Sequence, residues 1–343
     1  GVKIQGTIID TMVAAPLIDE NRFSYSLNNL GRDYINMRKD ERTLRAAAND
    51  HGFDPKGEMW RLNSRFVGAY AEKDAEITLK LWQRFKTEIE VQSLMTVFDL
   101  ETALIPVMLD MREKGVKVNI NQAEQTKTKL IARKKELVAE IKRDTGVQVE
   151  PWVAKSVAKV FDYHNLHYNN TEGNGQPSFT KAFLQAHPHE VAAKILRLRE
   201  LDKASNTFVD NILKFSHKGR IHCEFHQLRS DDGGTVTGRF SSSNPNLQQI
   251  PARDPEIKAM IRGLFVPDDD CKWGSFDYSS QEPRLLVHYC ASLNEEDRHP
   301  AIDDVVAEYH KGDADFHQMV ADMANITRKQ AKTVNLGIMY GMG

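Results

Sequence analysis

Residues 328–343 read RKQAKTVNLGIMYGMG and carry the strongest helical pattern in the chain. On a helix, Arg328 and Lys332 stand one turn apart on one face, and Lys329 adds a third cation to that turn. Like charges at this spacing repel by roughly 0.2–0.5 kcal/mol. Leu336 and Tyr340 continue the same face. The pattern predicts either a plain basic surface or a face that binds a polyphosphate while the Tyr340 ring abuts a base or sugar.

The composition of the chain indicates a soluble protein with two or three domains. Its 343 residues, 41% of them hydrophobic, suffice for several cores. No apolar run approaches the roughly 20 residues that span a bilayer, and the opening GVKIQGTIID lacks the pattern of a signal peptide. The cysteines Cys223, Cys271 and Cys290 are widely spaced, which suggests neither a disulfide framework nor a zinc cluster. We expect reduced thiols and a cytoplasmic location.

Positive charge is concentrated locally rather than over the whole chain. The formal net charge of −2 gives no global nucleic-acid signature, and no G-x-x-x-x-G-K-[ST] loop is present to cradle phosphates. Residues 121–143, however, hold seven Lys or Arg against three Glu, with an apolar stripe at helical spacing. This segment is predicted to be an amphipathic basic helix, either an ordinary solvated helix or a phosphate-binding one.

The hydrophobic patterns predict a mixed helix and strand organisation. Residues 6–18 suggest a buried strand that leads into a helix, and residues 26–35 suggest a helix opened by Ser26 or Asn28. Further expectations are a helix over residues 66–85, short strands within 220–228 and an exposed Gly- and Ser-rich loop over 229–251. A strand ending near Asp277, a short turn and a helix running to about Ala291 are expected after that loop.

Three side chains have both a chemical and a plain structural interpretation. Asp277, between a predicted strand and a predicted helix, suits a Mg²⁺ ligand or a simple turn residue. Glu282 completes an S-x-x-E capping box that begins at Ser279. Arg239, next to Gly238, either reaches a phosphate or base edge or lies on a flexible surface loop. The residues alone leave these alternatives open.

Three motifs occur together and in one order: TVTGRFSSSNPNLQQIP at 235–251, DYSSQEPRLLVHYCA at 277–291 and RKQAKTVNLGIMYG at 328–341. This succession closely resembles family A DNA polymerases, the DNA polymerase I type. ALIPVMLDMREKGVKVN at 103–119 resembles the approach to the thumb of that family. GAYAEKDAEITLKLW at 68–82 resembles the third motif of its 3′–5′ proofreading exonuclease, Tyr-x-x-x-Asp.

The resemblance implies an α/β (α+β) fold with a right-hand polymerase, incomplete in palm, fingers and thumb. The C-terminal part of a ribonuclease H-like 3′–5′ exonuclease domain would precede it. We expect this exonuclease part at 1–92, the thumb and the approach to the palm at 93–220, and partial palm and fingers at 221–343. The basic segment 121–143 would grip duplex phosphates as part of the thumb.

The resemblance also implies roles around an incoming nucleotide. Asp277 would be a catalytic ligand shared by two Mg²⁺ ions, helped by the backbone carbonyl of Tyr278. Arg328 and Lys332 would grip the dNTP triphosphate, and Lys332 is a candidate proton donor to pyrophosphate. His317, in the segment DADFHQM, would join that phosphate contact.

Further implied roles concern the sugar, the template and the primer. Glu282 would be a steric gate under the nucleotide sugar, and this displaces the capping box. Tyr340 would stack near the templating position, and Arg239 would enter the minor groove at the primer terminus. Tyr70 and Asp74 would belong to an exonuclease metal site. The implied activity is DNA-templated addition of dNTPs to a primer 3′-hydroxyl by a Mg²⁺-dependent monomer bound to primer-template DNA and to no membrane.

The sequence departs from the family pattern in three ways. The last polymerase motif, His-Asp-Glu, would follow Gly343, so we expect a fragment that is inactive alone; Asp313 and Asp315 precede the nucleotide-binding helix and do not replace that motif. The first two exonuclease motifs would precede Gly1, so no proofreading is expected. Leu336 stands where the family usually has Phe or Tyr, which resembles phage-type polymerases and affects dideoxynucleotide discrimination.

Two other functions compete with this interpretation. A single-subunit RNA polymerase shares the same core, although Glu282 argues against it. A non-catalytic DNA-binding remnant would grip primer-template without extending it.

Overall fold

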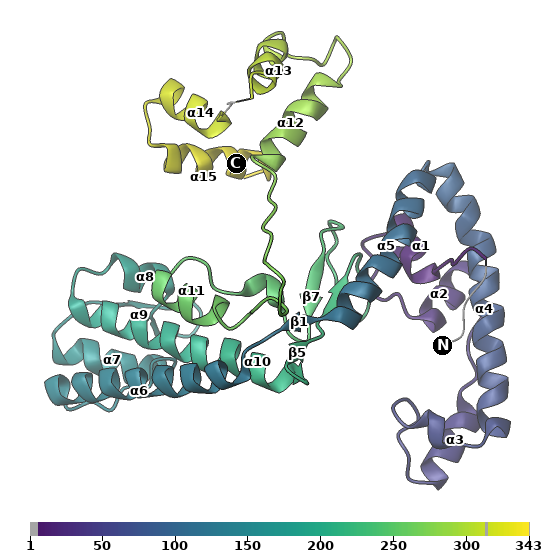
Figure 1. The fold of residues 1–343 in the computed structure, drawn as a ribbon, viewed down its shortest axis with the longest axis horizontal. Coiled ribbons are helices and arrows are strands. Elements are labelled where there is room, and N and C mark those ends of the chain that lie inside the picture. Colours follow the sequence, from purple (N-terminus) through teal and green to yellow (C-terminus); the bar gives the residue numbers. More distant parts are fainter. Residues whose placement is uncertain (1–5, 313–314, 343) are drawn as a thin grey trace. The chain divides into compact units, whose positions relative to one another are not determined.

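The computed structural model describes residues 6–312 and 315–342. The chain divides into two compact units, Gly1–Cys271 and Lys272–Gly343. Figure 1 shows the elements of both units.

The first part of the larger unit is a helical layer. Its elements are α1 (Thr11–Ile18), α2 (Leu27–Ile35), α3 (Arg42–Asp50), the 3₁₀ helix η1 (Met59–Arg61), α4 (Ser64–Val91) and α5 (Met95–Lys114). The Ser26 side chain caps α2 by accepting the backbone N–H of Asn29, as predicted. The helix predicted over residues 66–85 is confirmed within the longer α4, whose buried Ile77, Leu81 and Phe85 pack against α1 and α2.

The strand predicted before the first helix is wrong. Residues 6–9 form no strand, and the side chains of Ile8 and Ile9 are exposed. A strand needs a neighbour to complete its hydrogen-bond ladder, and the described part of this unit has no strand before Val116. Asp10 instead caps α1 by accepting the backbone N–H of Met12 at 2.8 Å, and Val13 is buried in the helix that follows.

A helical subdomain follows α5. It contains α6 (Ile120–Thr145), α7 (Ala154–Tyr163), α8 (Lys181–Ala186), α9 (Glu190–Lys203), the π-helix η2 (Ala204–Val209) and α10 (Asp210–Phe215). The predicted basic helix is confirmed as α6, which packs along α9 and η2 (Figure 1). Asn119 starts α6 by accepting the backbone N–H of Gln122 at 3.0 Å, and Gly146 ends it in the left-handed region.

Short antiparallel strands flank this subdomain. The strands β1 (Val116–Lys117), β5 (Arg220–Ile221) and β4 (Ser216–His217) form a sheet in that order, and β2 (Asn169–Asn170) pairs with β3 (Pro177–Ser178). The hairpin of β6 (Glu224–His226) and β7 (Ser241–Ser243) pairs Phe225 with Ser242. The strands predicted within 220–228 are thus confirmed. The predicted loop 229–251 additionally contains β7 and the 3₁₀ helix η3 (Leu247–Gln249).

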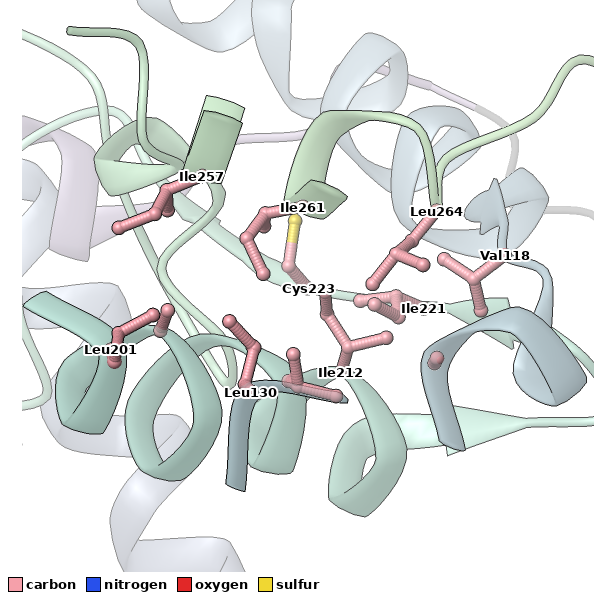
Figure 2. Packing of buried hydrophobic residues seen from close by; sticks show 12 residues of the cluster. Val118, Leu130, Leu201, Ile212, Ile221, Cys223, Ile257, Ile261 and Leu264 are labelled. Atoms are coloured by element: carbon pink, nitrogen blue, oxygen red, sulfur yellow. The ribbon is translucent and has the colours of Figure 1, made fainter. Parts of the chain in front are cut away.

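A buried apolar cluster joins α6, the π-helix, β5 and α11 (Pro255–Arg262). Figure 2 shows Leu130, Ile221, Cys223 and Ile261 meeting in this core. Full burial of one such aliphatic side chain stabilises the fold by about 1.5–3 kcal/mol. Burial also raises the pKa of the Cys223 thiol. The core therefore holds the start of the β6–β7 hairpin against the helical subdomain.

The smaller unit consists of four described helices. They are α12 (Gln281–Ala291), α13 (Ile302–His310), α14 (Phe316–Ala324) and α15 (Arg328–Met339), with α12 packed on α13 and α14 on α15. The C-terminal end of α12 and the position of α15 agree with the sequence. The strand predicted to end near Asp277 is wrong, because residues 272–278 have no strand neighbour within the described parts of the chain. None of the described helices is long and apolar enough to cross a bilayer.

Candidate functional site

The basic face of α15 begins with an ion pair inside the smaller unit. Arg328 Nε donates to Asp315 Oδ2 at 2.7 Å, with the two side chains 52% and 38% exposed. Asp315 also caps α14 by accepting the backbone N–H of Gln318 at 3.1 Å. The hydrogen bond from Arg328 lowers the pKa of the Asp315 carboxyl. Asp315 is thus the anion that faces Arg328, and Asp313, the other acid of that segment, lies outside the described residues.

Lys332 lies one turn further along the same face. Its side chain is exposed and forms no ion pair or hydrogen bond within residues 6–312 and 315–342. A capping box starts α15, in which Thr327 accepts the backbone N–H of Gln330 and the Gln330 side chain accepts the backbone N–H of Thr327. The helix is therefore held from its first turn, and it presents an exposed ammonium group beside a carboxylate-bound guanidinium group.

His317 connects α14 to α15 from the buried side. It is 6% exposed, and Asn335 Nδ2 donates to its Nδ1 at 3.1 Å. An acceptor at Nδ1 corresponds to the neutral tautomer that carries its proton on Nε2. Burial lowers the pKa of His317, and the nearby positive charges of Lys332 and Arg328 add to this effect, although Asp315 opposes it. The imidazole is therefore an uncharged group at neutral pH, buried behind the cations of α15.

The other end of α15 contacts the start of α12. The Tyr340 hydroxyl donates a hydrogen bond to Glu282 Oε1. The N-cap of α12 is Ser280, which has a left-handed backbone and no side-chain capping bond. The capping box proposed for Ser279 and Glu282 is therefore wrong, because the helix starts one residue too late for it. Glu282 instead directs its carboxylate to a tyrosine 58 residues further along the chain.

Asp277 and Tyr278 precede α12 in an extended segment. Both side chains are exposed, and Asp277 forms no ion pair or hydrogen bond with any described residue. Arg284 Nε donates to the Ser279 carbonyl at 3.0 Å, which holds the turn that follows. Mg²⁺ is commonly bound by one or two carboxylates together with phosphate oxygens and water. Asp277 fits such a site as one ligand, although the described residues contain no cluster of three acids, histidines or cysteines.

These contacts order the candidate site along α15. The bond between Glu282 and Tyr340 places the start of α12 at the C-terminal end of α15. Arg328 lies 12 residues before Tyr340, which corresponds to about 18 Å along a helix. Leu336 lies between them and is half-buried. One end of the helix therefore carries cations, and the other ends at an aromatic ring that contacts the carboxylate of Glu282.

The larger unit contains the remaining predicted DNA contacts. Arg239 is exposed in the loop between β6 and β7, one residue after Gly238, which has a φ of +71°. Thr235 Oγ1 donates to the Arg239 carbonyl at 2.8 Å.

The basic helix α6 uses only some of its cations internally. Lys134 pairs with Asp202 at 2.5 Å and Lys127 pairs with Asp210 at 2.6 Å, so both hold the helical subdomain together. A second group is exposed and forms no ion pair with a described residue: Lys129, Lys135, Lys142 and Arg143. This second group is available to an external anion.

The predicted exonuclease residues lie together, but with a lysine between them. Lys39 Nζ donates to Asp74 Oδ2 at 2.9 Å and to the Tyr70 hydroxyl at 3.2 Å, and its side chain is 12% exposed. Burial alone would lower the pKa of Lys39, but the hydrogen bonds to Asp74 and Tyr70 outweigh it and the pKa is raised. An ammonium group occupies the place of a cation here, so this pair does not fit a divalent metal in this arrangement.

Sequence reasoning missed three of these partners. Lys39, Asp315 as a partner of Arg328, and Asn335 are each far in sequence from the residue that they contact. Asn335 alone had a local signal. It lies on the same helix face as the buried Ala331, and a buried amide requires a hydrogen-bond partner.

Comparisons with known proteins show the family to which the chain belongs. The pattern of DNA polymerase family A matches residues 120–343, and that of a 3′–5′ exonuclease matches residues 1–90. The chain belongs to DNA polymerase family A, and its N-terminal region is of the 3′–5′ exonuclease type. The predicted family and the predicted fold class are thereby confirmed.

Particular relatives come from phages and bacteria. The chain is 36% identical over 348 residues to a DNA-directed DNA polymerase of Pseudomonas phage M6, covering 97% of this chain and 52% of that protein. It is 30% identical over 350 residues to DNA polymerase I of Treponema pallidum, covering 98% of this chain and 32% of that protein. The chain thus spans about half or less of the length of these curated relatives.

A solved structure shares the fold. It is the POL domain of Pol1 from M. smegmatis in complex with DNA primer-template and dNTP, with a TM-score of 0.73 and 22% identity over 97% of this chain and 54% of that one.

Proposed function

We propose that this chain is part of a DNA-templated DNA polymerase that adds dNTPs to a primer 3′-hydroxyl. The observation that carries the proposal is the face of α15. Arg328 is held there by the half-exposed carboxylate of Asp315, and Lys332 next to it has no partner among the described residues. A triphosphate is the ligand that would satisfy both cations at once.

The phosphates bind at the N-terminal half of α15. Arg328 exchanges Asp315 for phosphate oxygens, which costs little because the ion pair is half exposed and worth at most about 1 kcal/mol. Lys332 binds the same phosphates as a point charge and is positioned to give a proton to the leaving pyrophosphate. His317 supports this surface from below through its bond to Asn335, and it contributes to the phosphate contact through this support.

The sugar and base bind at the other half of the helix. Glu282 stands at the start of α12 and excludes a 2′-hydroxyl from the sugar site. The Tyr340 ring stacks near the templating base, and its hydroxyl orients the Glu282 carboxylate. Leu336 contacts the sugar between these groups.

Asp277 and the Tyr278 carbonyl would bind Mg²⁺. When bound there, Mg²⁺ would lower the pKa of the primer 3′-hydroxyl and neutralise the charge that develops on pyrophosphate. Because Asp277 is a single carboxylate, we expect this chain to be inactive without further ligands from the whole polymerase. Arg239 binds in the minor groove at the primer terminus, and the exposed cations of α6 bind duplex phosphates.

Three further properties follow from the proposed function. The region that contains Tyr70 and Asp74 does not proofread, since Lys39 holds both side chains. The polymerase acts as a monomer in the cytoplasm of a bacterium or a phage-infected host, and the choice of host is supported by its relatives from a phage and a bacterium. Deoxynucleotides, not ribonucleotides, are its substrates, because Glu282 lies at the sugar position.

Replacement of Lys332 in the full-length protein tests the proposal. Lys332→Ala should lower the incorporation rate by about a hundredfold or more, since one preorganised cation at a transferring phosphoryl group is worth several kcal/mol. Primer-template binding should change little. Lys329→Ala is the matched control, because Lys329 lies on the same turn but off the face of Arg328 and Lys332. Equal activity of the two variants would refute the assignment.

A further inference from the structure

The loop between β6 and β7, residues 227–240, is held at both of its ends. At its base, β6 and β7 pair in antiparallel register, with His226 opposite Ser241. The His226 ring adds a contact across the hairpin, since its Nε2 lies 2.8 Å from Ser243 Oγ. Arg239 lies two residues before Ser241, so the backbone of Arg239 is close to a strand that is fixed in the hairpin.

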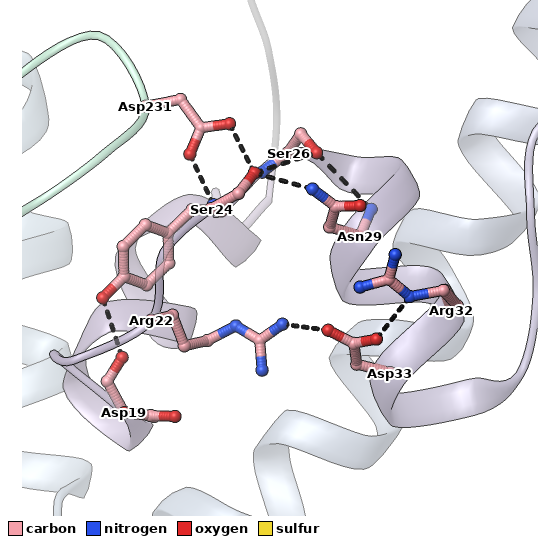
Figure 3. Close-up of polar contacts among 9 residues, drawn as sticks. Asp19, Arg22, Ser24, Ser26, Asn29, Arg32, Asp33 and Asp231 are labelled. Atoms are coloured by element: carbon pink, nitrogen blue, oxygen red, sulfur yellow. Dashed lines mark hydrogen bonds and ion pairs between the residues drawn. The ribbon is translucent and has the colours of Figure 1, made fainter.

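The tip of the same loop is bound by the exonuclease-type region. Asp231 Oδ1 accepts the backbone N–H of Tyr25 at 2.5 Å, and its Oδ2 accepts the Ser24 hydroxyl at 2.8 Å (Figure 3). Ser24 is itself fixed, because its hydroxyl oxygen accepts Asn29 Nδ2 at 2.9 Å. One carboxylate thus joins the loop to the segment that leads into α2.

Other contacts hold the first half of the loop to α5 and to the same exonuclease-type region. Gln227 Nε2 donates to the Glu101 carbonyl at 2.8 Å. Leu228 packs on the apolar cluster of α1, α2 and α4, and Arg229 donates to the Glu20 carbonyl at 3.3 Å. The first half of the loop is therefore docked against these elements and does not extend freely into solvent.

The chain then reverses sharply towards Arg239. Ser230 and Gly233 form a bridge, in which the Ser230 N–H donates to the Gly233 carbonyl at 2.7 Å. Gly234 has a φ of +90°, and a Cβ atom there would lie 2.1 Å from the Leu228 carbonyl oxygen. Only glycine fits this approach. The second half of the loop is exposed, so its course depends on the docked half and on β7.

We infer that the exonuclease-type region serves as a support for the polymerase, with Asp231 as the positioning residue that sets the loop bearing Arg239. This inference rests on the proposed function of Arg239 at the primer terminus. Asp231 itself touches no substrate. Its two hydrogen bonds hold the docked half of the loop, and the second half thereby presents Arg239 in one place.

Kinetics of the full-length polymerase on primer-template test the inference. Asp231→Asn keeps the shape of the side chain, but its amide group cannot accept both hydrogen bonds. The variant should raise the KM for primer-template about threefold to tenfold, which is the effect expected from the loss of one or two hydrogen bonds. The change in kcat should be smaller. Asp232→Asn is the matched control, because Asp232 is an exposed neighbour whose carboxylate contacts no described residue. It should behave as the parent protein does.

A double variant separates positioning from general stability. If Asp231 acts through Arg239, Asp231→Asn should add no further rise in KM to an Arg239→Ala protein. Additive effects, or equal KM values for Asp231→Asn and Asp232→Asn, would overturn the inference. Should Asp231→Asn fail to fold, Ser24→Ala takes its place in the same comparison, because it removes one of the two bonds of Asp231 together with the bond from Asn29.

The outcome is separable from that of the proposed function. If Lys332→Ala still abolishes incorporation while the effects of Asp231→Asn and Arg239→Ala add, the polymerase assignment stands and the support role falls. If Lys332→Ala is fully active, the proposed polymerase function is refuted, whatever the variants of Asp231 and Arg239 show.

Discussion

The hydroxyl of Tyr340, at the end of α15, donates a hydrogen bond to the carboxylate of Glu282, in the first turn of α12. This contact joins the aromatic ring that we assign to the template side with the carboxylate that we assign to the sugar. A change in one residue is therefore transmitted to the other.

Glu282→Ala should relax sugar discrimination. Removing the carboxylate opens space for a 2′-hydroxyl, and a single pocket group of this kind is worth roughly 1–3 kcal/mol, or about ten- to a hundredfold in selectivity. The ratio of kcat/KM for dNTP and rNTP measures it. Glu295→Ala, in the exposed loop after α12, should leave the ratio unchanged. An unaltered ratio in Glu282→Ala would contradict the gate.

The ion pair of Asp315 and Arg328 should make stability depend on pH at the acid side. Because Arg328 lowers the pKa of Asp315 below its unfolded value, the pair stabilises the folded state above the ordinary aspartate range, and this contribution is lost as the pH falls through the folded pKa. Half exposure limits the gain to at most about 1 kcal/mol.

Asp315→Asn isolates this contribution, since asparagine retains the capping of α14. The difference in unfolding free energy between parent and variant should be constant at pH values well above the ordinary aspartate range and should shrink as the pH falls through the folded pKa of Asp315. Chemical denaturation at several pH values measures it. A difference that persists at the lowest pH would show that Asp315 acts through something other than its charge.

The sequence allowed prediction of the elements that depend on local spacing. The positions of α4, α6, α12 and α15 follow from helical periodicity, and the start of α2 follows from its Ser26 cap. The strand expected before Asp277 failed because a strand exists only with a neighbour, and pairing is not encoded in the segment itself.

The site residues also divide into those that the sequence predicts and those that only the packing of helices reveals. The motifs place Arg328, Lys332 and Tyr340 on one helix. Their partners, Asp315 and Glu282, become visible only when other helices pack against it.

Lys39 should be needed for the stability of the exonuclease-type region. Lys39→Met leaves the half-buried carboxylate of Asp74 without its cation, which should cost about 1–3 kcal/mol. Lys73→Met, on the same helix as Asp74, removes only a surface pair with Glu76 and should cost less than about 1 kcal/mol. Urea unfolding compares the two variants. Equal costs would mean that the contact of Lys39 with Asp74 and Tyr70 stabilises no more than an ordinary surface pair does.

Asn335→Asp should convert the neutral imidazole of His317 into a charged one. The amide now donates to Nδ1, whereas a carboxylate at that place accepts a proton from Nδ1 and stabilises the imidazolium. The pKa of His317, which burial lowers in the parent, should rise by about one unit or more. Titration of the His317 ring signals by NMR measures the shift, and Asn294→Asp in the exposed loop is the control. An unchanged pKa in Asn335→Asp would show that the amide does not face Nδ1 in solution, and the neutral support beneath Arg328 and Lys332 would then need another explanation.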